Sequence, residues 1–142
     1  MKKLFILALF LTLCMCGCDF ALEHSNSILV FSARPINRET ASPKMIQDTF
    51  GTGQLIHFCI YSKEPFNSNE GRIQIIKKDP NTQIYGFSMV QTLDINPIPG
   101  KNFCTGTFTV YTDGYYMARV FLKTSPKEPI AQKLFWITKE DN

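Results

Sequence analysis

The chain has 142 residues with 15 basic and 12 acidic side chains, which give a formal net charge of +3. A charge so close to balance, without a basic stripe, argues against nucleic-acid binding and against a polybasic membrane patch. The length predicts one domain of ordinary size behind an N-terminal signal.

The N-terminal segment predicts export from the cell. Lys2 and Lys3 precede an apolar run from Leu4 to about Gly17, and the sequence becomes polar directly after Cys18. A charged start, a short apolar core and a small residue at the cut are typical of a secretory signal peptide. The apolar run is about 14 residues, so an uncleaved membrane anchor, which needs about 20 apolar residues, is the weaker interpretation.

The residues at the expected cut, Met15-Cys16-Gly17-Cys18, resemble the lipobox of bacterial lipoproteins. The resemblance implies that residues 1–17 are a signal peptide and that Cys18 is acylated, with palmitate or similar chains, and becomes the mature N-terminus. It also implies attachment to a membrane of the bacterial cell envelope. Asp19 resembles an inner-membrane retention signal, which would place the chain at the periplasmic face; otherwise the outer membrane is expected. A secretory signal that is cut elsewhere, without a lipid, is the alternative.

Residues 18–27 are expected to be the lipidated cysteine and a polar tether, and residues 28–142 a β-sandwich domain. From residue 28 the sequence alternates apolar and polar residues, and turn residues interrupt this pattern about every ten positions. The pattern predicts about seven strands, at residues 28–34, 54–62, 72–78, 83–93, 102–111, 115–123 and 130–139. Only Ser42-Pro43 and the residues from Lys44 to Thr49 predict a helical turn.

Short strands separated by turns favour two packed antiparallel sheets, and a small barrel is the main alternative. Gly114-Tyr115-Tyr116-Met117-Ala118 resembles the start of strand F in immunoglobulin-like domains. The resemblance implies an all-β, immunoglobulin-like antiparallel β-sandwich in which Tyr116 is the tyrosine corner, with its hydroxyl bonded to nearby backbone. Ala118 stands at the place of the second cysteine of those domains, and the single tryptophan, Trp136, lies in the last expected strand.

Cys59 and Cys104 are the cysteines that remain beyond the signal and Cys18. An even pair in an exported domain favours a disulfide, because the compartment is oxidising; two buried free thiols are the alternative. The resemblance places the two cysteines on neighbouring strands of one sheet. The alternation of apolar residues turns Cys104 inward and Cys59 outward, so a bond would need a bulge, for which Gly106 is the expected site.

The sequence contains none of the usual catalytic motifs, such as Gly-x-Ser-x-Gly, His-Glu-x-x-His, a phosphate loop or a calcium loop. His57 stands between Ile56 and Phe58 and is expected to be a packed strand residue. We therefore expect no catalytic residue, no metal and no cofactor. A hydrolase or metalloenzyme is a remote alternative.

Binding is the class of function that the sequence favours. Phe66 and Ile98 lie in expected loops and are candidates for contact with a protein partner. Lysines near the last expected strands are typical of charges that protect a sheet edge: Lys123, Lys127, Lys133 and Lys139. We expect a lipid-anchored binding or assembly module of the cell envelope. The alternative is a surface-exposed, adhesin-like lipoprotein that contacts host or matrix molecules.

Overall fold

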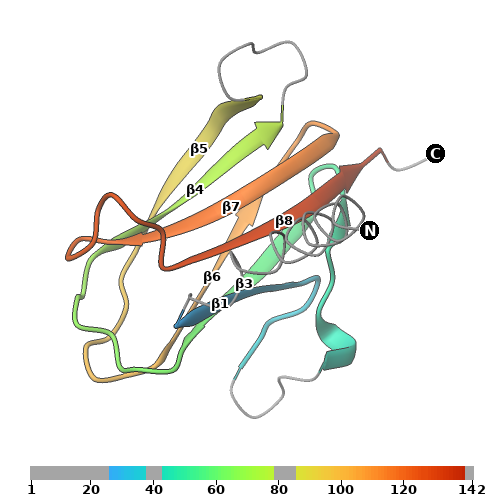
Figure 1. Cartoon of the computed structure of the whole chain (residues 1–142). Coiled ribbons are helices and arrows are strands. Elements are labelled where there is room, and N and C mark those ends of the chain that lie inside the picture. The colour runs from blue at the N-terminus through green and yellow to red at the C-terminus, as the bar shows by residue number, and fades with distance from the viewer. Residues whose placement is uncertain (1–25, 38–42, 79–85, 140–142) are drawn as a thin grey trace, which may run out of the picture.

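The computed structural model describes residues 26–37, 43–78 and 86–139, in which the alternating segments form eight strands (Figure 1). In chain order the strands are β1 (Ser27–Ser32), β2 (Thr49–Gly51), β3 (Leu55–Ser62), β4 (Gly71–Lys78), β5 (Phe87–Ile95), β6 (Phe103–Thr109), β7 (Gly114–Leu122) and β8 (Ala131–Thr138). All of the strands except β2 correspond to a predicted strand. The predicted helical turn is reduced to a 3-10 helix, η1 (Pro43–Met45), and Thr49 already belongs to β2.

The strands form two sheets that face each other, with the orders β1-β3-β6 and β2-β8-β7-β4-β5. Neighbouring strands are antiparallel except β2 and β8, which are parallel. Figure 1 shows the sheets as two separate layers. The predicted immunoglobulin-like sandwich is therefore confirmed, and the barrel is excluded. The strands that carry Cys59 and Cys104, which were expected to be neighbours, are β3 and β6, and they pair from Leu55 to Tyr61 and from Phe103 to Thr109.

The core lies between the sheets and is formed by the inward side chains of both. Phe31 from β1, Phe108 from β6 and Phe135 from β8 meet edge to face, with ring centroids 5.1–5.7 Å apart. Such edge-to-face geometry is a preferred arrangement of aromatic rings. Each fully buried apolar side chain contributes roughly 1.5–3 kcal/mol relative to an exposed one, so this cluster stabilises the contact between the layers.

Tyr116 is completely buried and forms the contact expected of a tyrosine corner. Its hydroxyl donates a hydrogen bond to the carbonyl oxygen of Thr112 at 2.8 Å, and it lies 2.7 Å from the Thr112 hydroxyl oxygen. The ring stacks on Phe135 at 5.5 Å. The bond fixes the turn that precedes β7, where Gly114 adopts a positive φ of 144°.

The predicted disulfide is not formed: Cys59 and Cys104 are both free thiols. Cys104 lies opposite Ile60 on the inward side of the three-stranded sheet, whereas Cys59 lies opposite Thr105 on its outward side. Successive side chains of a strand point to opposite faces, so the two sulfur atoms are separated by the sheet. The pairing of β3 with β6 continues past Gly106 without a register shift, and the expected bulge there is absent.

The bulge of this structure lies instead between β4 and β5. Ile75 is opposite Gln91 and Ile76 is opposite Met89, so that Val90 is the extra residue on β5. Position 106 requires a glycine for a different reason: a Cβ atom there would lie 2.5 Å from the Phe58 ring.

The predicted signal peptide, the lipid site at Cys18, and Asp19 lie outside the described residues. Within the described ranges, no helix is both long enough and apolar enough to cross a membrane.

Candidate functional site

The outward side of the five-stranded sheet carries an apolar surface across four of its strands. One row of facing residues consists of Leu134 on β8, Met117 on β7, Ile76 on β4 and Met89 on β5. Leu134 is 42% exposed and Met89 is 55% exposed. In a sheet with one face in solvent, outward positions are usually polar, so this row departs from the common pattern.

A second row continues the apolar surface toward the end of the sheet at which β8 ends. Trp136 is 51% exposed and stacks on Tyr115, with ring centroids 4.3 Å apart. The Lys78 ammonium nitrogen lies 5.9 Å from the centroid of the Tyr115 ring. We call the outward side chains of these two rows the apolar half of the outer face: Ile76, Met89, Tyr115, Met117, Leu134 and Trp136.

The rest of the outer face is polar and holds one buried aromatic ring. Phe121 is 5% exposed although it points away from the core, because two guanidinium groups lie over its ring. The guanidinium carbons of Arg72 and Arg119 are 5.2 and 5.5 Å from its centroid. Arg119 also donates a hydrogen bond to the Gln74 side chain at 3.2 Å. These contacts give the polar half a fixed arrangement of cationic groups.

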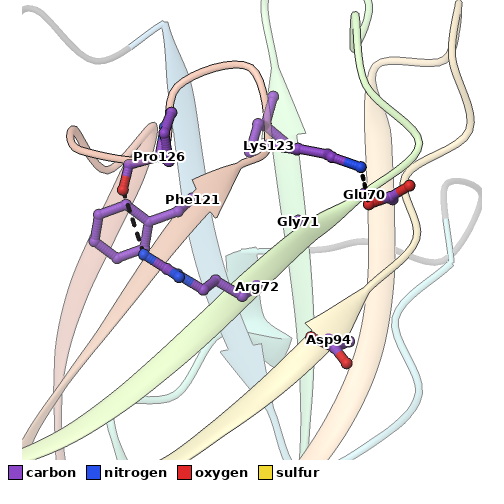
Figure 2. Close-up of a pocket in the computed structure, with 8 residues that line it drawn as sticks. Glu70, Gly71, Arg72, Asp94, Phe121, Lys123 and Pro126 are labelled. Carbon is purple, nitrogen blue, oxygen red and sulfur yellow. Dashed lines mark hydrogen bonds and ion pairs between the residues drawn. The ribbon is translucent and has the colours of Figure 1, made fainter.

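A shallow pocket lies beside Arg72, and Figure 2 shows the residues that line it. Its volume is about 230 Å³. Arg72 donates a hydrogen bond to the carbonyl oxygen of Pro126 at 3.3 Å, and the Lys123 ammonium lies 2.7 Å from a carboxylate oxygen of Glu70. Asp94 also lines the pocket. Two cationic and two anionic side chains share this pocket, so its charges balance and do not select an anion or a cation.

The two loops proposed for partner contact differ in their exposure. Phe66 is 4% exposed and belongs to the core cluster, so its ring is not available to a partner at this surface. Ile98 is 64% exposed and lies at the first position of a turn, in which the Lys101 amide donates to the Ile98 carbonyl oxygen at 3.0 Å. Gly100 at the third position has a φ of 81°, as a type II turn requires.

β2 covers only the last part of the β8 edge, where it pairs with Trp136, Ile137 and Thr138. Lys133 forms an ion pair with Asp48 at 2.8 Å, next to the point where β2 begins. Lys123 is paired with Glu70. The outermost strand on this side of the sheet is therefore the short β2, which the sequence did not predict.

The polar chemistry of the described residues is limited. Among these residues, no group of three or more His, Cys, Asp or Glu side chains could hold a metal ion. His57 is half-buried on the outward side of β3. Burial raises the pKa of the Cys59 and Cys104 thiols, and the nearby Cys104 adds to the effect on Cys59. Both thiols are thereby kept protonated, which is the unreactive form.

The apolar half of the outer face was not singled out in the sequence, although a signal was present. In β7 and β8 several outward positions are apolar, namely Tyr115, Met117, Leu134 and Trp136. Two apolar faces on neighbouring strands indicate either a buried sheet or a surface that a partner covers.

Comparison with models of known protein families finds no match, and comparison with curated proteins finds none either. Among solved structures, the chain is similar to the soluble domain of PmoD from Methylocystis sp. ATCC 49242 (Rockwell). The TM-score is 0.50 at 15% identity, over 79% of this chain and 90% of that one. At this identity the likeness shows the fold alone, which is the β-sandwich described above.

Two further similarities are weaker. A variant of superoxide reductase (neelaredoxin) from Ignicoccus hospitalis matches with a TM-score of 0.42 at 10% identity, over 82% of each chain. A β-glucosidase from Listeria innocua matches with a TM-score of 0.38 at 14% identity, over 84% of this chain and 17% of that one.

Proposed function

We propose that this chain is a lipid-anchored, non-catalytic binding module of a bacterial cell envelope. In this proposal it binds a protein partner through the apolar half of the outer face. The observation that carries the proposal is the row of exposed apolar side chains at Leu134, Met89 and Trp136, on a sheet face that no part of the described chain covers.

The residue types of this surface support a protein partner. Aromatic residues, methionine and arginine are enriched at protein interfaces relative to the rest of a protein surface. The outer face combines the stacked Tyr115 and Trp136 with Met89 and Met117, and the arginines of its polar half border them. A stacked aromatic pair loses little conformational entropy on binding, so it is suited to be the centre of an interface.

The support for the lipid anchor comes from the sequence before the domain. A single acyl chain holds a protein reversibly, whereas two or three hold it firmly, at about 0.8 kcal/mol for each buried methylene. A chain acylated at Cys18 would therefore remain at the membrane, and the partner would be another component of the envelope. Asp19 favours the periplasmic face of the inner membrane.

Replacing the acylated residue tests the anchor. We expect the full-length Cys18→Ser chain to leave the detergent phase in Triton X-114 partitioning and to lose the mass of the acyl chains, while the wild-type chain retains both. Cys16→Ser is the matched control and should behave as wild type. A Cys18→Ser chain that still partitions with detergent and keeps its added mass would overturn the anchor.

Site-specific crosslinking tests the binding surface. A photoreactive phenylalanine analogue at Leu134 is expected to form a discrete adduct in intact cells, and Trp136→Ser in the same chain should abolish it. The same analogue at Thr107, exposed on the other sheet, is the control. An adduct of the same mass and yield from Thr107, or one that Trp136→Ser does not change, would exclude the outer face as the binding surface.

A further inference from the structure

The chain enters the sandwich at a defined end. Ser27 pairs with Ser62, and the Asn26 carbonyl oxygen accepts a hydrogen bond from the Lys63 amide at 2.8 Å. Only eight peptide units separate Cys18 from Asn26, and a segment of this length spans at most about 29 Å when fully extended. An acylated Cys18 therefore keeps this end of the sandwich close to the bilayer.

The same end carries two connections that are bonded into one unit. These are the residues after β3 and the residues before β6, which run together at the lower left of Figure 1. The Phe66 amide donates to the Lys101 carbonyl oxygen at 2.8 Å, and the Gly100 amide donates to the Phe66 carbonyl oxygen at 3.1 Å. Phe66 is buried below them and Pro97 is fully buried. The turn at Ile98 is thus held by hydrogen bonds and by packing on both sides.

Exposed apolar side chains gather at this end, on the turn and on the first outward-facing pair of the three-stranded sheet. Ile98 is 64% exposed, and the facing pair Ile28 and Tyr61 are 57% and 43% exposed. Two exposed lysines, Lys63 and Lys101, adjoin them. We call these five residues the anchor-side surface. Glu64 is the exposed anionic side chain that follows Lys63 directly, so the cationic character of the surface is modest.

We propose that the anchor-side surface is a second contact with the lipid bilayer, in which Ile98, Ile28 and Tyr61 enter the interface and Lys63 and Lys101 face anionic headgroups. This inference rests on the proposed lipid anchor. Tyrosine is enriched at the membrane–water interface, and each lysine near an anionic leaflet adds to the attraction. The contact can be weak and still be occupied, because the tether keeps the surface at a high effective concentration near the bilayer.

The consequence of this contact is an orientation. Trp136 and Tyr115 lie at the opposite end of the strands, since Tyr115 is the second residue of β7 whereas Leu122 ends it opposite Gly71. With the anchor-side surface at the bilayer, the aromatic row of the outer face is directed away from the membrane. The proposed partner surface is then presented to the compartment and not covered by lipid.

Tryptophan fluorescence in reconstituted vesicles tests the contact. The chain has one tryptophan, so Trp136→Phe gives a background in which Tyr61→Trp or Ile98→Trp is the only reporter. Tyr111→Trp is the matched control, because Tyr111 is 79% exposed and lies at the other end of the sandwich. The acylated full-length variants are placed in phosphatidylethanolamine–phosphatidylglycerol vesicles that contain brominated lipid.

We expect bromine to quench the tryptophan of the Tyr61→Trp or Ile98→Trp variant by more than about twofold, as interface depth requires. The tryptophan of the Tyr111→Trp variant should keep nearly all of its fluorescence. Hydrogen exchange on the wild-type chain gives a second readout without a substitution: amides near Lys63 and Ile98 should exchange more slowly in vesicles than in detergent.

Vesicle flotation separates the two proposals. A chain that floats with the vesicles but shows equal quenching at both ends, and no protection of those amides, overturns the second contact alone. A chain that does not float overturns the anchor and this inference with it.

Discussion

The hydroxyl of Tyr116 joins the turn before β7 to the core of the sandwich. Its bond to the Thr112 carbonyl oxygen lies below a fully buried ring, so the ring and the hydroxyl constrain the same turn from two directions. The bond itself is only partly buried, because Thr112 is an exposed residue, and such a hydrogen bond contributes about 0.5–1.5 kcal/mol to stability. The energetic role of this residue therefore differs from that of the neighbouring aromatic residues, which contribute through apolar contact alone.

Tyr116→Phe should lower the free energy of unfolding by about 0.5–1.5 kcal/mol, because the hydrogen bond to the Thr112 carbonyl is lost. Urea denaturation of the purified domain measures this change, and the slope of the transition should stay constant. Tyr111→Phe removes an exposed hydroxyl and should change the stability by less than about 0.5 kcal/mol. Equal effects of the two substitutions would show that the corner bond contributes nothing.

The two thiols are expected to react slowly, at a rate that rises with pH, and Cys59 is expected to react before Cys104. Burial raises the pKa of both, so the thiolate forms only as the pH rises above the ordinary thiol pKa of about 8.5. The two thiols therefore stay protonated to a higher pH in the folded chain than in the unfolded chain. The stability that this difference contributes is fully present below the ordinary thiol pKa and is lost as the pH rises through the raised pKa of the folded chain. Peptide mapping after iodoacetamide treatment should show Cys59 modified before Cys104, since Cys104 is buried. Faster modification of Cys104 would contradict the assignment of the two faces.

At the level of strands, the pairing of β3 with β6 depends on a missing side chain. The Phe58 ring occupies the space above Gly106, where a Cβ would lie 2.5 Å from the ring. Inserting atoms into a packed core forces side chains out of their preferred rotamers. The glycine thus allows an aromatic residue on β3 to fill the edge of the core beside β6.

Gly106→Ala should destabilise the domain by about 1–3 kcal/mol, because the ring of Phe58 must move. Thr107→Ala is the control on the same strand, since Thr107 is exposed and opposite the half-buried His57. Thermal unfolding of the two variants gives the comparison. A Gly106→Ala chain as stable as Thr107→Ala would mean that the ring moves without cost.

The short strand β2 covers the last part of the β8 edge, at Trp136, Ile137 and Thr138. Its three residues pair in parallel with β8, and Phe50 is buried in the core. Three residues are too few to show an alternating pattern. Their position was therefore decided by the exposed edge of β8 and by the space that Phe50 fills.

For the molecule as a whole, the absence of a bond between Cys59 and Cys104 has a direct consequence. A disulfide between Cys59 and Cys104 would close a loop of about 45 residues and would add about 3–4 kcal/mol of stability in the chain-entropy model. The structure places the two thiols on opposite faces, so the stability has to come from the core between the sheets.

The midpoint of thermal unfolding should therefore be the same with and without dithiothreitol. Differential scanning calorimetry of the folded domain under oxidising conditions makes the comparison. A fall of several degrees on reduction, which a loss of about 3–4 kcal/mol would cause in a domain of about 120 residues, would show that the cysteines are bonded.

The sequence by itself determined the strands and the class of fold. Seven strands were predictable because alternation is a local property of each segment, and Tyr116 was identifiable because the residues around its turn are contiguous. Cys104 and Cys59 were also assigned correctly to the inward and outward sides, since each assignment depends only on its own strand.

Only the tertiary structure decided how these segments meet. The register of β3 against β6 places Cys59 and Cys104 on opposite faces of the sheet, so they do not form a disulfide. The Phe58 ring fills the space beside Gly106, and Phe66 is buried in the core. The apolar half of the outer face and the anchor-side surface each combine residues from strands or loops far apart in the chain. Such surfaces depend on register and on sheet order, which are set by contacts between distant segments and not by the pattern within any one of them.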